Sequence, residues 1–294
     1  MVCNFPGLDN FIKAALNEDI GSGDITTIAC VPESATSKGS FIAKEPGVIS
    51  GIGVAKRVFE LLDDAVIVST LVNDSDSVKK GDIIATIKGP SRAILTGERT
   101  ALNLLQHMSG VATRTAEAVK EIKGTKTKIL DTRKITPGMR VLDKYAVTCG
   151  GGSNHRFNLA DGVLIKDNHI KASGGITNAV GNARQMQHEK QEKIKVSNEL
   201  FAKPPIMPIE VETENLKQVQ EALDAGADII MLDNMPPDMM TEAVRLINKK
   251  ALTEASGKMG ESDLKAIAET GVDYISIGAL THSIKALDIS LKFE

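Results

Sequence analysis

The amino-acid sequence predicts an α/β protein in two parts, a small antiparallel sheet with helices and a larger domain of parallel strands. From about residue 38 to 88, short β-rich segments are separated by Pro-Gly and Lys-Gly turns, a pattern typical of an antiparallel sheet. After residue 126, six short apolar runs alternate with helical stretches, which predicts parallel strands joined by helical crossovers. This alternation leaves open whether the strands form an open sheet or a closed barrel.

Three helices are expected in and beside the first part. Residues 8–18 carry an apolar stripe at helical spacing, and Gly21 follows at the position of a helix C-cap. A second helix is expected at about residues 53–62, between β-rich segments. The stretch from residue 96 to 124 predicts a long helix with an apolar side and a polar stripe that includes Arg99.

The composition is that of an ordinary globular protein of 294 residues, 42% hydrophobic and 25% charged, with enough chain for a sizeable core. The formal net charge of -3 argues against a polyanion-binding surface and predicts no nucleic-acid partner. The sequence contains no long apolar run and no signal-like N-terminus, so we expect a cytoplasmic protein without membrane contact. The three cysteines lack C-x-x-C spacing, which indicates a reducing compartment and inert packing for Cys149.

Each of the six predicted strands is followed by residues that can do chemistry. In chain order, the strand ends carry Arg133 with Lys134, Lys166, Glu212, Asp233, Ser256 with Gly257, and Gly278. Because the carboxyl ends of barrel strands converge on one mouth, these residues are predicted to share a site. Single members have other interpretations: Lys166 as a surface lysine, Glu212 as a helix cap, and Asp233 as an Asx-turn residue.

Carboxylates and cations are both expected to line this mouth. Glu210 and Glu212 lie two residues apart and therefore on one strand face, which cannot pack against apolar helices without a large desolvation penalty. His155 and Arg156 follow three glycines and add to the cations at residues 133 and 134. A strongly cationic pocket with Glu212 and Asp233 on one wall suits a polyanion together with a divalent cation such as Mg2+.

The last two strand ends carry small residues instead. Ser256, Gly257 and Gly278 let backbone N–H groups approach a ligand, and the loops after the final two strands are the usual phosphate site of a barrel. These residues are therefore predicted to bind a monophosphate.

Long stretches of the chain resemble one family. The most specific block contains "LDTRKITPGMR", "GGGSNHR" and "KDNH" and fixes about 35 residues at once, while "GERTALN", "IEVET" and "EASG" add shorter matches. The chain resembles quinolinate phosphoribosyltransferase, also called carboxylating nicotinate-nucleotide pyrophosphorylase, over nearly its whole length. The weakest part of the resemblance is residues 180–206, and residues 182–205 are predicted to be a solvated helix and loop.

The resemblance implies an N-terminal α/β sandwich domain over residues 1–113 and an incomplete (β/α) TIM-like barrel over residues 114–282. Residues 283–294 would return to the first domain. It also implies a homodimer with site residues shared across the interface, and leaves open whether dimers assemble further.

The family transfers phosphoribosyl from 5-phosphoribosyl-1-pyrophosphate to quinolinate with loss of carbon dioxide, giving nicotinate mononucleotide and pyrophosphate in NAD biosynthesis. The resemblance implies Mg2+ as cofactor, with Glu212 and Asp233 as its ligands. Quinolinate is expected to bind Arg133, His155, Arg156, Lys166 and Arg99 of the partner subunit. The sugar donor is expected to bind Lys134, Lys166, Glu212, Asp233, Ser256, Gly257 and Gly278, of which the two lysines and two carboxylates are assigned to catalysis. Such ligands would cancel the repulsion among the clustered cations.

Two positions depart from the family pattern. Ile135 stands where threonine is usual after Arg-Lys, and Lys258 enters the phosphate loop where glycine or asparagine is usual. Lys258 either adds a cation to the 5-phosphate site or changes the loop conformation, and the sequence leaves both open.

Three other functions fit part of the sequence. A barrel aldolase would use Lys134 or Lys166 to form a Schiff base. A non-catalytic carrier-like protein is suggested by the segment "GDIIATIKGP", although that hairpin lacks a modifiable lysine in a tight turn. A paralogous pyrophosphorylase acting on a different aromatic acid is the nearest alternative.

Overall fold

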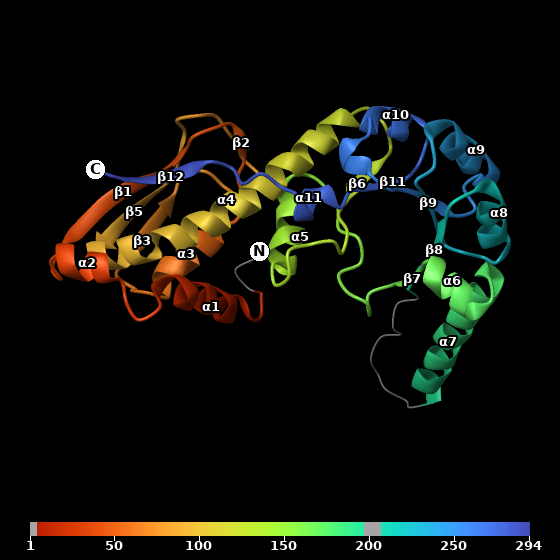
Figure 1. The fold of residues 1–294 in the computed structure, drawn as a ribbon, viewed down its shortest axis with the longest axis horizontal. Coiled ribbons are helices and arrows are strands. Elements are labelled where there is room, and N and C mark those ends of the chain that lie inside the picture. The colour runs from red at the N-terminus through yellow and green to blue at the C-terminus, as the bar shows by residue number, and fades with distance from the viewer. Residues whose placement is uncertain (1–4, 197–206) are drawn as a thin grey trace. The chain divides into compact units, whose positions relative to one another are not determined.

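The structure, a computed structural model, describes residues 5–196 and 207–294 (Figure 1). The chain forms two compact units, each built from more than one segment. The first unit takes the chain up to residue 119 and adds residues 135–152 and 280–294, and the second takes residues 120–134 and 153–279. Cys3 and residues 197–206 of the predicted solvated loop lie outside the described residues.

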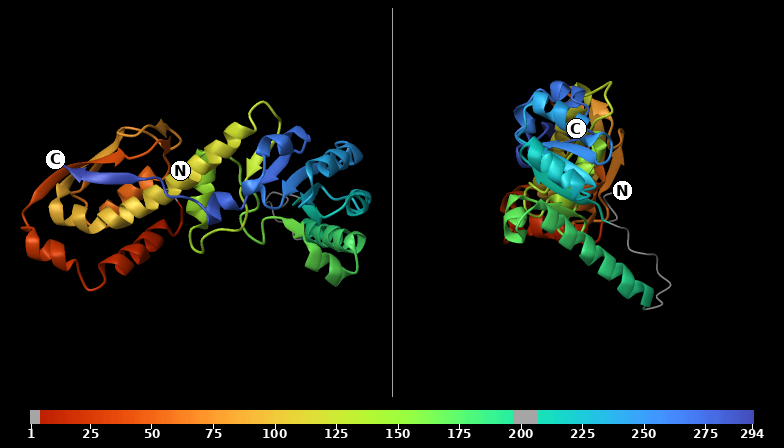
Figure 2. Two further views of the ribbon diagram at one scale, coloured as in Figure 1. Left: turned by 45° about the horizontal axis from the view of Figure 1, so that its top comes forward. Right: turned by 90° about the vertical axis from the view of Figure 1, so that its right-hand side faces the viewer.

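The first unit is built on a four-stranded antiparallel sheet with the strand order β12-β1-β5-β3. Its strands are β1 (Thr36–Ala43), β3 (Ile67–Thr70), β5 (Ile83–Pro90) and β12 (Ile289–Phe293), and a separate small sheet pairs β2 (Gly47–Val48) with β4 (Ser77–Val78). Strand β12 pairs with β1 from Gly39 opposite Phe293 to Ala43 opposite Ile289. Figure 2 shows this blue C-terminal strand beside the red-orange strands. The predicted return of the C-terminal segment is confirmed.

Most helices of the first unit pack against this sheet through one buried apolar cluster. The helices are α1 (Leu8–Ile20), α2 (Ile25–Cys30), α3 (Ile52–Glu60), α4 (Ser91–Glu121), α5 (Arg140–Cys149) and the short α11 (Ala279–His282). Phe41 of β1 meets Phe59 of α3 edge to face, with ring centroids 6.2 Å apart. The three predicted helices are confirmed; Gly21 ends α1 with a φ of 56°, and α4 begins five residues before the predicted start.

The second unit contains a six-stranded sheet in the order β6-β11-β10-β9-β8-β7, with every paired strand parallel. Its strands are β6 (Lys128–Leu130), β7 (Val163–Ile165), β8 (Ile209–Thr213), β9 (Ile229–Asp233), β10 (Leu252–Ser256) and β11 (Tyr274–Ser276). All six match the apolar runs that predicted them. Within the described part of the chain, β6 and β7 are the two edges, so the sheet is an open curved one and not a closed barrel.

Crossover helices connect these strands and cover the outer side of the curved sheet (Figure 1). They are α6 (Asp167–Ser173), α7 (Ile176–Val196), α8 (Leu216–Asp224), α9 (Pro237–Ile247) and α10 (Leu264–Glu269), with a 3-10 turn, η2 (Met259–Glu261), after β10. Side chains at the caps set where the helices begin. Asn215 accepts a hydrogen bond from the N–H of Gln218 at the start of α8, and Asp263 does the same for Ala266 at the start of α10.

The compact units do not follow the predicted domain boundaries throughout. Helix α5 lies in the sequence range of the second domain but packs in the first unit, where Leu142, Ala146 and Val147 join the main apolar cluster. Cys149 at the end of this helix is buried and Cys30 is exposed, and neither forms a disulfide. No helix in the described part of the chain is both long enough and apolar enough to span a membrane.

Candidate active site

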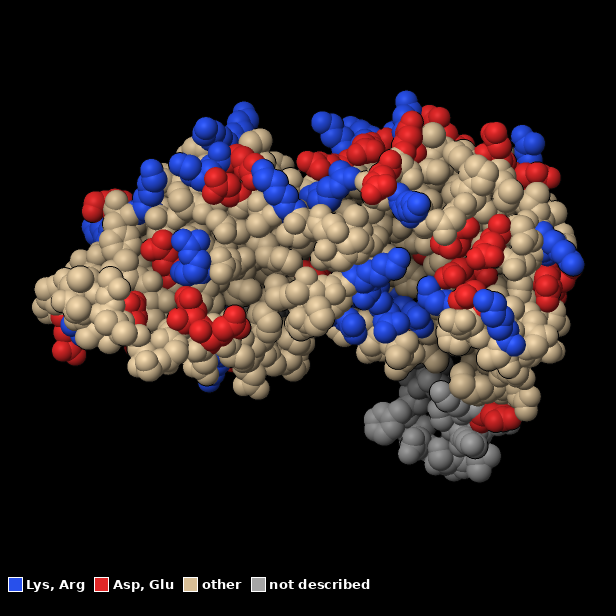
Figure 3. Space-filling model, in the orientation of Figure 1, with Lys and Arg blue, Asp and Glu red and all other residues tan. Residues whose placement is uncertain are grey.

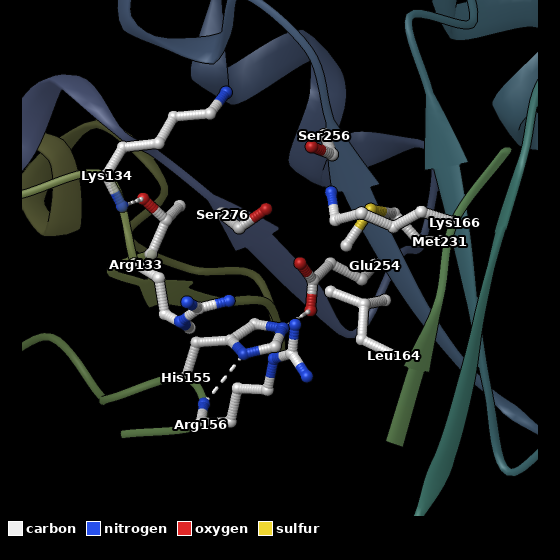
Figure 4. A pocket seen from close by; sticks show the side chains of 11 residues that line it. Arg133, Lys134, His155, Arg156, Leu164, Lys166, Met231, Glu254, Ser256 and Ser276 are labelled. Carbon is white, nitrogen blue, oxygen red and sulfur yellow. Dashed lines mark hydrogen bonds and ion pairs between the residues drawn. The ribbon is translucent and has the colours of Figure 1, made fainter. Parts of the chain in front are cut away.

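The carboxyl ends of the parallel strands surround a pocket of about 290 Å³ in the second unit (Figure 4). Its lining consists of Thr132, Arg133, Lys134, His155, Arg156, Leu164, Lys166, Met231, Glu254, Ser256 and Ser276. Five of these side chains carry or can carry a positive charge, against one carboxyl group. Figure 3 shows a dense group of Lys and Arg side chains on this unit, near the position of β7 in Figure 1. The pocket therefore fits an anionic ligand.

Asp131 ties together the two chain segments that bring most of this charge. It directly follows β6, its side chain is fully buried, and its Oδ1 accepts a hydrogen bond of 2.8 Å from the backbone N–H of His155. Leu130 and Ser153 form a bridge between the same segments. An apolar run that ends in a buried aspartate thus positions the loops that carry the pocket's arginines.

The two arginines of the pocket lie close enough to repel each other, and Arg133 has a buried donor without an acceptor among the described residues. Nε of Arg133 is buried and has no hydrogen-bond partner among the described residues. Arg156 donates from Nη1 to the carbonyl oxygen of Gly162 at 3.1 Å. Burial, and then the positive charge of Arg133, lower the pKa of Arg156. Because the two guanidinium groups repel each other, a bound carboxylate would both cancel the repulsion and supply the missing acceptors.

His155 is oriented by a hydrogen bond to each ring nitrogen. Its Nδ1 accepts from the backbone N–H of Arg156 at 2.7 Å, so the ring proton is on Nε2. Nε2 lies 3.1 Å from Oε2 of Glu210 and 3.6 Å from Oε2 of Glu254. Burial works to lower the pKa of His155, but the hydrogen bond that Nε2 donates to Glu210 and the charges of both glutamates outweigh it and raise the pKa. With Nδ1 as an acceptor, the ring is the neutral tautomer that donates from Nε2, and uptake of a second proton would break the hydrogen bond from Arg156.

Glu210 and Glu254 lie buried beside His155, and Glu254 also lines the pocket. Glu254 is 1% exposed and Glu210 is 4% exposed, and Oε1 of each has no hydrogen-bond partner among the described residues. Burial, followed by the negative charge of Glu210, raises the pKa of Glu254 to about 8. With His155 they form a group of ligand-type atoms within 4.8 Å of one another. We call these three residues the deep cluster.

Lys166 and Glu212 form a second charged contact, nearer the carboxyl ends of the strands. Lys166 follows β7, and its Nζ donates to Oε2 of Glu212 on β8 at 2.9 Å. The two side chains are 45% and 16% exposed. This contact, the outer pair, argues against the interpretation of Lys166 as an unrelated surface lysine. Asn215 caps α8, so Glu212 is not its cap.

Glu212 and Asp233 end neighbouring strands and offer only oxygen donors. Oδ2 of Asp233 accepts from Nδ2 of Asn234 at 2.6 Å. Mg2+ prefers oxygen ligands and is usually held by one or two carboxylates, waters and substrate phosphates. The two carboxylates therefore fit Mg2+ when a phosphorylated ligand is bound beside them.

The predicted phosphate loop follows β10. Ser256 lines the pocket and pairs in register with Asp233 of β9. Gly257 has a φ of 96°, and a Cβ there would collide with the side chain of Asn234, so this position requires glycine. Lys258 follows with a φ of 50°, in the left-handed region, and is exposed.

The structure brings six of the predicted site residues to the pocket lining, namely Arg133, Lys134, His155, Arg156, Lys166 and Ser256. Glu212, Asp233, Gly257 and Gly278 lie at or just after the ends of neighbouring strands of the same sheet. Arg99 is an exposed residue of α4 in the first unit. Burial raises the pKa of Glu98 beside it, and the charge of Arg99 opposes that shift.

Sequence reasoning missed five lining residues, Thr132, Leu164, Met231, Glu254 and Ser276. Glu254 could have been found by the rule that selected Glu210, because it lies two residues before Ser256 and therefore on the same strand face. The same spacing relates Ser276 to Gly278. Leu164 and Met231 carry no chemical signal that separates them from other apolar strand residues.

Comparison with known protein families identifies the family of the chain. A family model described as the N-terminal domain of quinolinate phosphoribosyl transferase matches residues 24–109, and the model of its C-terminal domain matches residues 111–203 and 196–292. The chain belongs to the quinolinate phosphoribosyltransferase family. A probable carboxylating nicotinate-nucleotide pyrophosphorylase of Bacillus subtilis is 46% identical over 284 residues, covering 95% of this chain and 92% of the relative.

Relatives from plants and solved structures extend the comparison. A chloroplastic carboxylating nicotinate-nucleotide pyrophosphorylase of Oryza sativa is 42% identical and covers 96% of this chain and 76% of its own length. The structure of nicotinate-nucleotide pyrophosphorylase from Francisella tularensis matches with a TM-score of 0.89 and 40% identity, covering 100% of this chain and 99% of that one. The predicted combination of an antiparallel-sheet domain and an incomplete parallel barrel is thereby confirmed.

Proposed function

We propose that this chain transfers the phosphoribosyl group of 5-phosphoribosyl-1-pyrophosphate to quinolinate and releases pyrophosphate and carbon dioxide, giving nicotinate mononucleotide for NAD biosynthesis. The observation that carries the proposal is the cationic pocket at the strand ends, with an unpartnered buried Nε on Arg133. Quinolinate brings two carboxylates, and its co-substrate brings a monophosphate and a pyrophosphate. Five cations against one lining carboxyl group suit that anionic load.

The roles of the residues follow from their side-chain chemistry. Arg133 and Arg156 bind the carboxylates of quinolinate, because a planar guanidinium group pairs with a carboxylate through two hydrogen bonds. His155 lies beside this carboxylate site, with its ring fixed by Arg156 and Glu210. Lys134 and Lys166 bind the pyrophosphate as compact point charges. The backbone around Ser256, Gly257 and Gly278 binds the 5-phosphate.

The reaction is a displacement followed by a decarboxylation. The lone pair of the pyridine nitrogen attacks the anomeric carbon while the bond from that carbon to pyrophosphate breaks, and Lys134 and Lys166 stabilise the negative charge that develops on the leaving group. The ring nitrogen is then cationic. The bond from C2 to its carboxylate breaks, the electron pair stays on C2 next to the cationic nitrogen, and a proton replaces the carbon dioxide.

Mg2+ is proposed as the cofactor, held by Glu212 and Asp233 together with phosphate oxygens. When bound, it would neutralise charge on the pyrophosphate. Glu212 also holds Lys166 through the 2.9 Å ion pair, so the lysine is positioned before the donor arrives. We further propose a homodimer in which Arg99 of the partner subunit contacts a quinolinate carboxylate.

The alternatives are less well supported. The ion pair of Lys166 with Glu212 favours an ammonium group over the free amine that a Schiff-base aldolase requires. The named relatives act as nicotinate-nucleotide pyrophosphorylases or quinolinate phosphoribosyltransferases, which does not favour a different aromatic acid.

The proposed function is tested by mixing the protein with Mg2+, quinolinate and 5-phosphoribosyl-1-pyrophosphate. We expect equal molar amounts of carbon dioxide and nicotinate mononucleotide, and no product when quinolinate or the sugar donor is omitted. A Lys134→Ala preparation serves as the control for contaminating enzyme. Absence of both products in the wild-type reaction would contradict the proposal.

A further inference from the structure

Glu254 has no part in the proposed reaction, although it lines the pocket. It lies in the middle of β10, opposite Met231 of β9 in the register. Figure 4 shows its carboxyl group among the lining side chains and directed towards His155. It is the one carboxyl group in the described lining of the pocket, and the ligand we propose carries carboxylates of its own. Its protonation state therefore matters for binding.

The surroundings of Glu254 favour a retained proton. Two carboxyl groups, from Glu210 on β8 and Glu254 on β10, face a single imidazole at 3.1 and 3.6 Å, and all three side chains are nearly buried. Arg156 in the adjoining loop also lines this pocket, while Met231 and Ser276 on the flanking strands contribute no ionisable group. Like charges this close and this deep cannot both ionise at moderate pH.

Distance and burial decide which carboxyl group keeps the proton. Glu210 lies nearer to Nε2 of His155 and is the better acceptor for its N–H group. Glu254 is farther from Nε2 and more buried, and burial together with the charge of Glu210 raises its pKa to about 8. Ser276 on β11 also interacts with this carboxyl group. The neutral acid carries one O–H donor, on a buried side chain that lines the pocket and also reaches Glu210.

We propose that Glu254 is a further substrate-binding residue, a neutral carboxylic acid that donates its O–H to a carboxylate of quinolinate; this inference rests on the proposed function. A neutral acid adds a hydrogen-bond donor without adding negative charge. The ionised side chain would instead present two acceptors to a dianionic ligand and repel it. Quinolinate therefore binds the protonated form, and binding and protonation of Glu254 are linked.

Glu254→Gln separates the neutral acid from the anion. The amide has nearly the same shape, stays neutral at every pH and still offers an N–H donor. The matched control is Glu242→Gln, because Glu242 is an exposed residue of α9 in the same unit. Quinolinate is titrated calorimetrically into wild type and both variants between about pH 6 and about pH 9.5.

We expect the affinity of Glu254→Gln for quinolinate to stay within about threefold of wild type near pH 6. Above about pH 8, each further pH unit should lower the wild-type affinity by an additional factor of about ten, compared with the affinity of the variant. Glu254→Gln also removes a charge that acts on His155, so the readout is the extra loss of affinity in wild type above about pH 8, where Glu254 ionises. Glu242→Gln should follow wild type throughout.

An infrared difference spectrum provides a readout that does not depend on substrate. At neutral pH, wild type minus Glu254→Gln should show the carbonyl band of a protonated carboxyl group, and the band should disappear as the pH rises past about 8. If the variant fails to fold, the disappearance of this band in wild type alone still decides whether a buried carboxyl group holds a proton.

Three outcomes would overturn the inference. Loss of at least about tenfold in quinolinate affinity near pH 6 in Glu254→Gln would mean that the negative charge is required. Absence of the protonated-carboxyl band would mean that Glu254 is ionised. A divalent ion bound to purified wild type and missing from the variant would make the deep cluster a metal site. Failure of wild type to bind quinolinate at any pH would instead refute the proposed function, and the infrared band would still report on Glu254.

Discussion

The pocket contains two contacts between carboxyl groups and cations, and they differ in depth. In the deep cluster, the side chains of His155, Glu210 and Glu254 are 12%, 6% and 1% exposed. In the outer pair, Lys166 and Glu212 are 45% and 16% exposed. Water can replace a partner in the outer pair but not in the deep cluster. The burial of the side chains therefore decides whether such a contact is fixed or can exchange a partner for water.

One strand supplies a member of each contact. Glu210 and Glu212 lie on the same face of β8, two residues apart, which moves the second carboxylate about 7 Å towards the open end of the strand. The inner residue holds a histidine in one charge state and orientation. The outer residue holds a lysine that can turn to a phosphate, because both partners remain accessible to solvent. Glutamate therefore has two different roles on β8, and its position along the strand decides which.

The largest expected effect tests whether the pocket of one chain needs a residue of a second subunit for activity. Homodimers of Arg99→Ala and of Lys134→Ala should each lose about a thousandfold in activity or more. A mixed dimer combines an intact pocket from one chain with an intact Arg99 from the other. For random mixing, roughly half the dimers are mixed and one of their two sites is whole, so about a quarter of wild-type activity should return.

This experiment requires subunit exchange, by refolding the mixture or by co-expression. Mixing each variant with itself under the same treatment provides the control. If verified mixed dimers show no recovery, Arg99 belongs to its own chain's site or to no site.

The outer pair should be the more sensitive of the two contacts to loss of its cation. Lys166→Ala removes a cation from the proposed pyrophosphate site and leaves Glu212 unpaired, so we expect kcat/KM to fall about 10²- to 10³-fold. Lys265→Ala removes an exposed lysine of α10 that makes only a surface ion pair with Glu269, and it should leave activity unchanged. Equal activities of the two variants, measured by pyrophosphate release, would place Lys166 outside the reaction.

Binding of the two substrates should depend on different residues of the pocket. Arg133→Ala and Arg156→Ala should weaken quinolinate binding by about 1.5 to 3 kcal/mol each, the range for hydrogen bonds to charged groups. Glu212→Ala and Asp233→Ala should instead weaken the sugar donor and the response to Mg2+. Calorimetric titrations of both substrates into all four variants would contradict this division if the order were reversed.

The smallest expected effect concerns the stability of the deep cluster. Glu254 has a pKa raised from 4.5 to about 8, so the folded state keeps a proton that the unfolded state releases, and stability falls as the pH rises across that window. The raised pKa of His155 acts in the same direction, because its contribution is lost above the folded-state pKa. Glu254→Gln removes the contribution of Glu254 to this pH dependence. The melting temperature of the variant relative to wild type should rise by a few degrees between about pH 5 and about pH 8. A difference that is constant with pH would show that Glu254 does not titrate.

Much of the fold could be predicted from the sequence because local patterns dictate it. The six apolar runs became six parallel strands, and Gly21 ended α1 where its missing side chain allows a positive φ. The membership of α5 in the first unit could not be predicted, because it depends on which apolar surface its buried face meets. The sheet is open because β6 and β7 are edge strands that do not pair with each other. The periodicity of apolar residues does not show whether the edge strands of a sheet pair.

The site was predictable where residue type and strand position coincide. Ser256 ends its strand, Lys166 directly follows one and Arg133 lies three residues past one, and all three line the pocket. Glu254 was missed because it lies inside β10 and only the residue that ends this strand, Ser256, was assigned to the site, although the two residues share a strand face. Lys258 remains without an assigned role, because its left-handed backbone and exposed side chain fit both an added cation and an altered loop.

The most direct test of the account is a comparison of quinolinate with nicotinate as the acceptor. Nicotinate lacks the 2-carboxylate, so it would leave one of the pocket's half-buried arginines without a partner, at a cost of about 3 kcal/mol. Since each 1.4 kcal/mol is about tenfold in rate, kcat/KM for quinolinate should exceed that for nicotinate by about a hundredfold or more. Equal values for the two acids would contradict the claim that this cationic pocket selects a dicarboxylate.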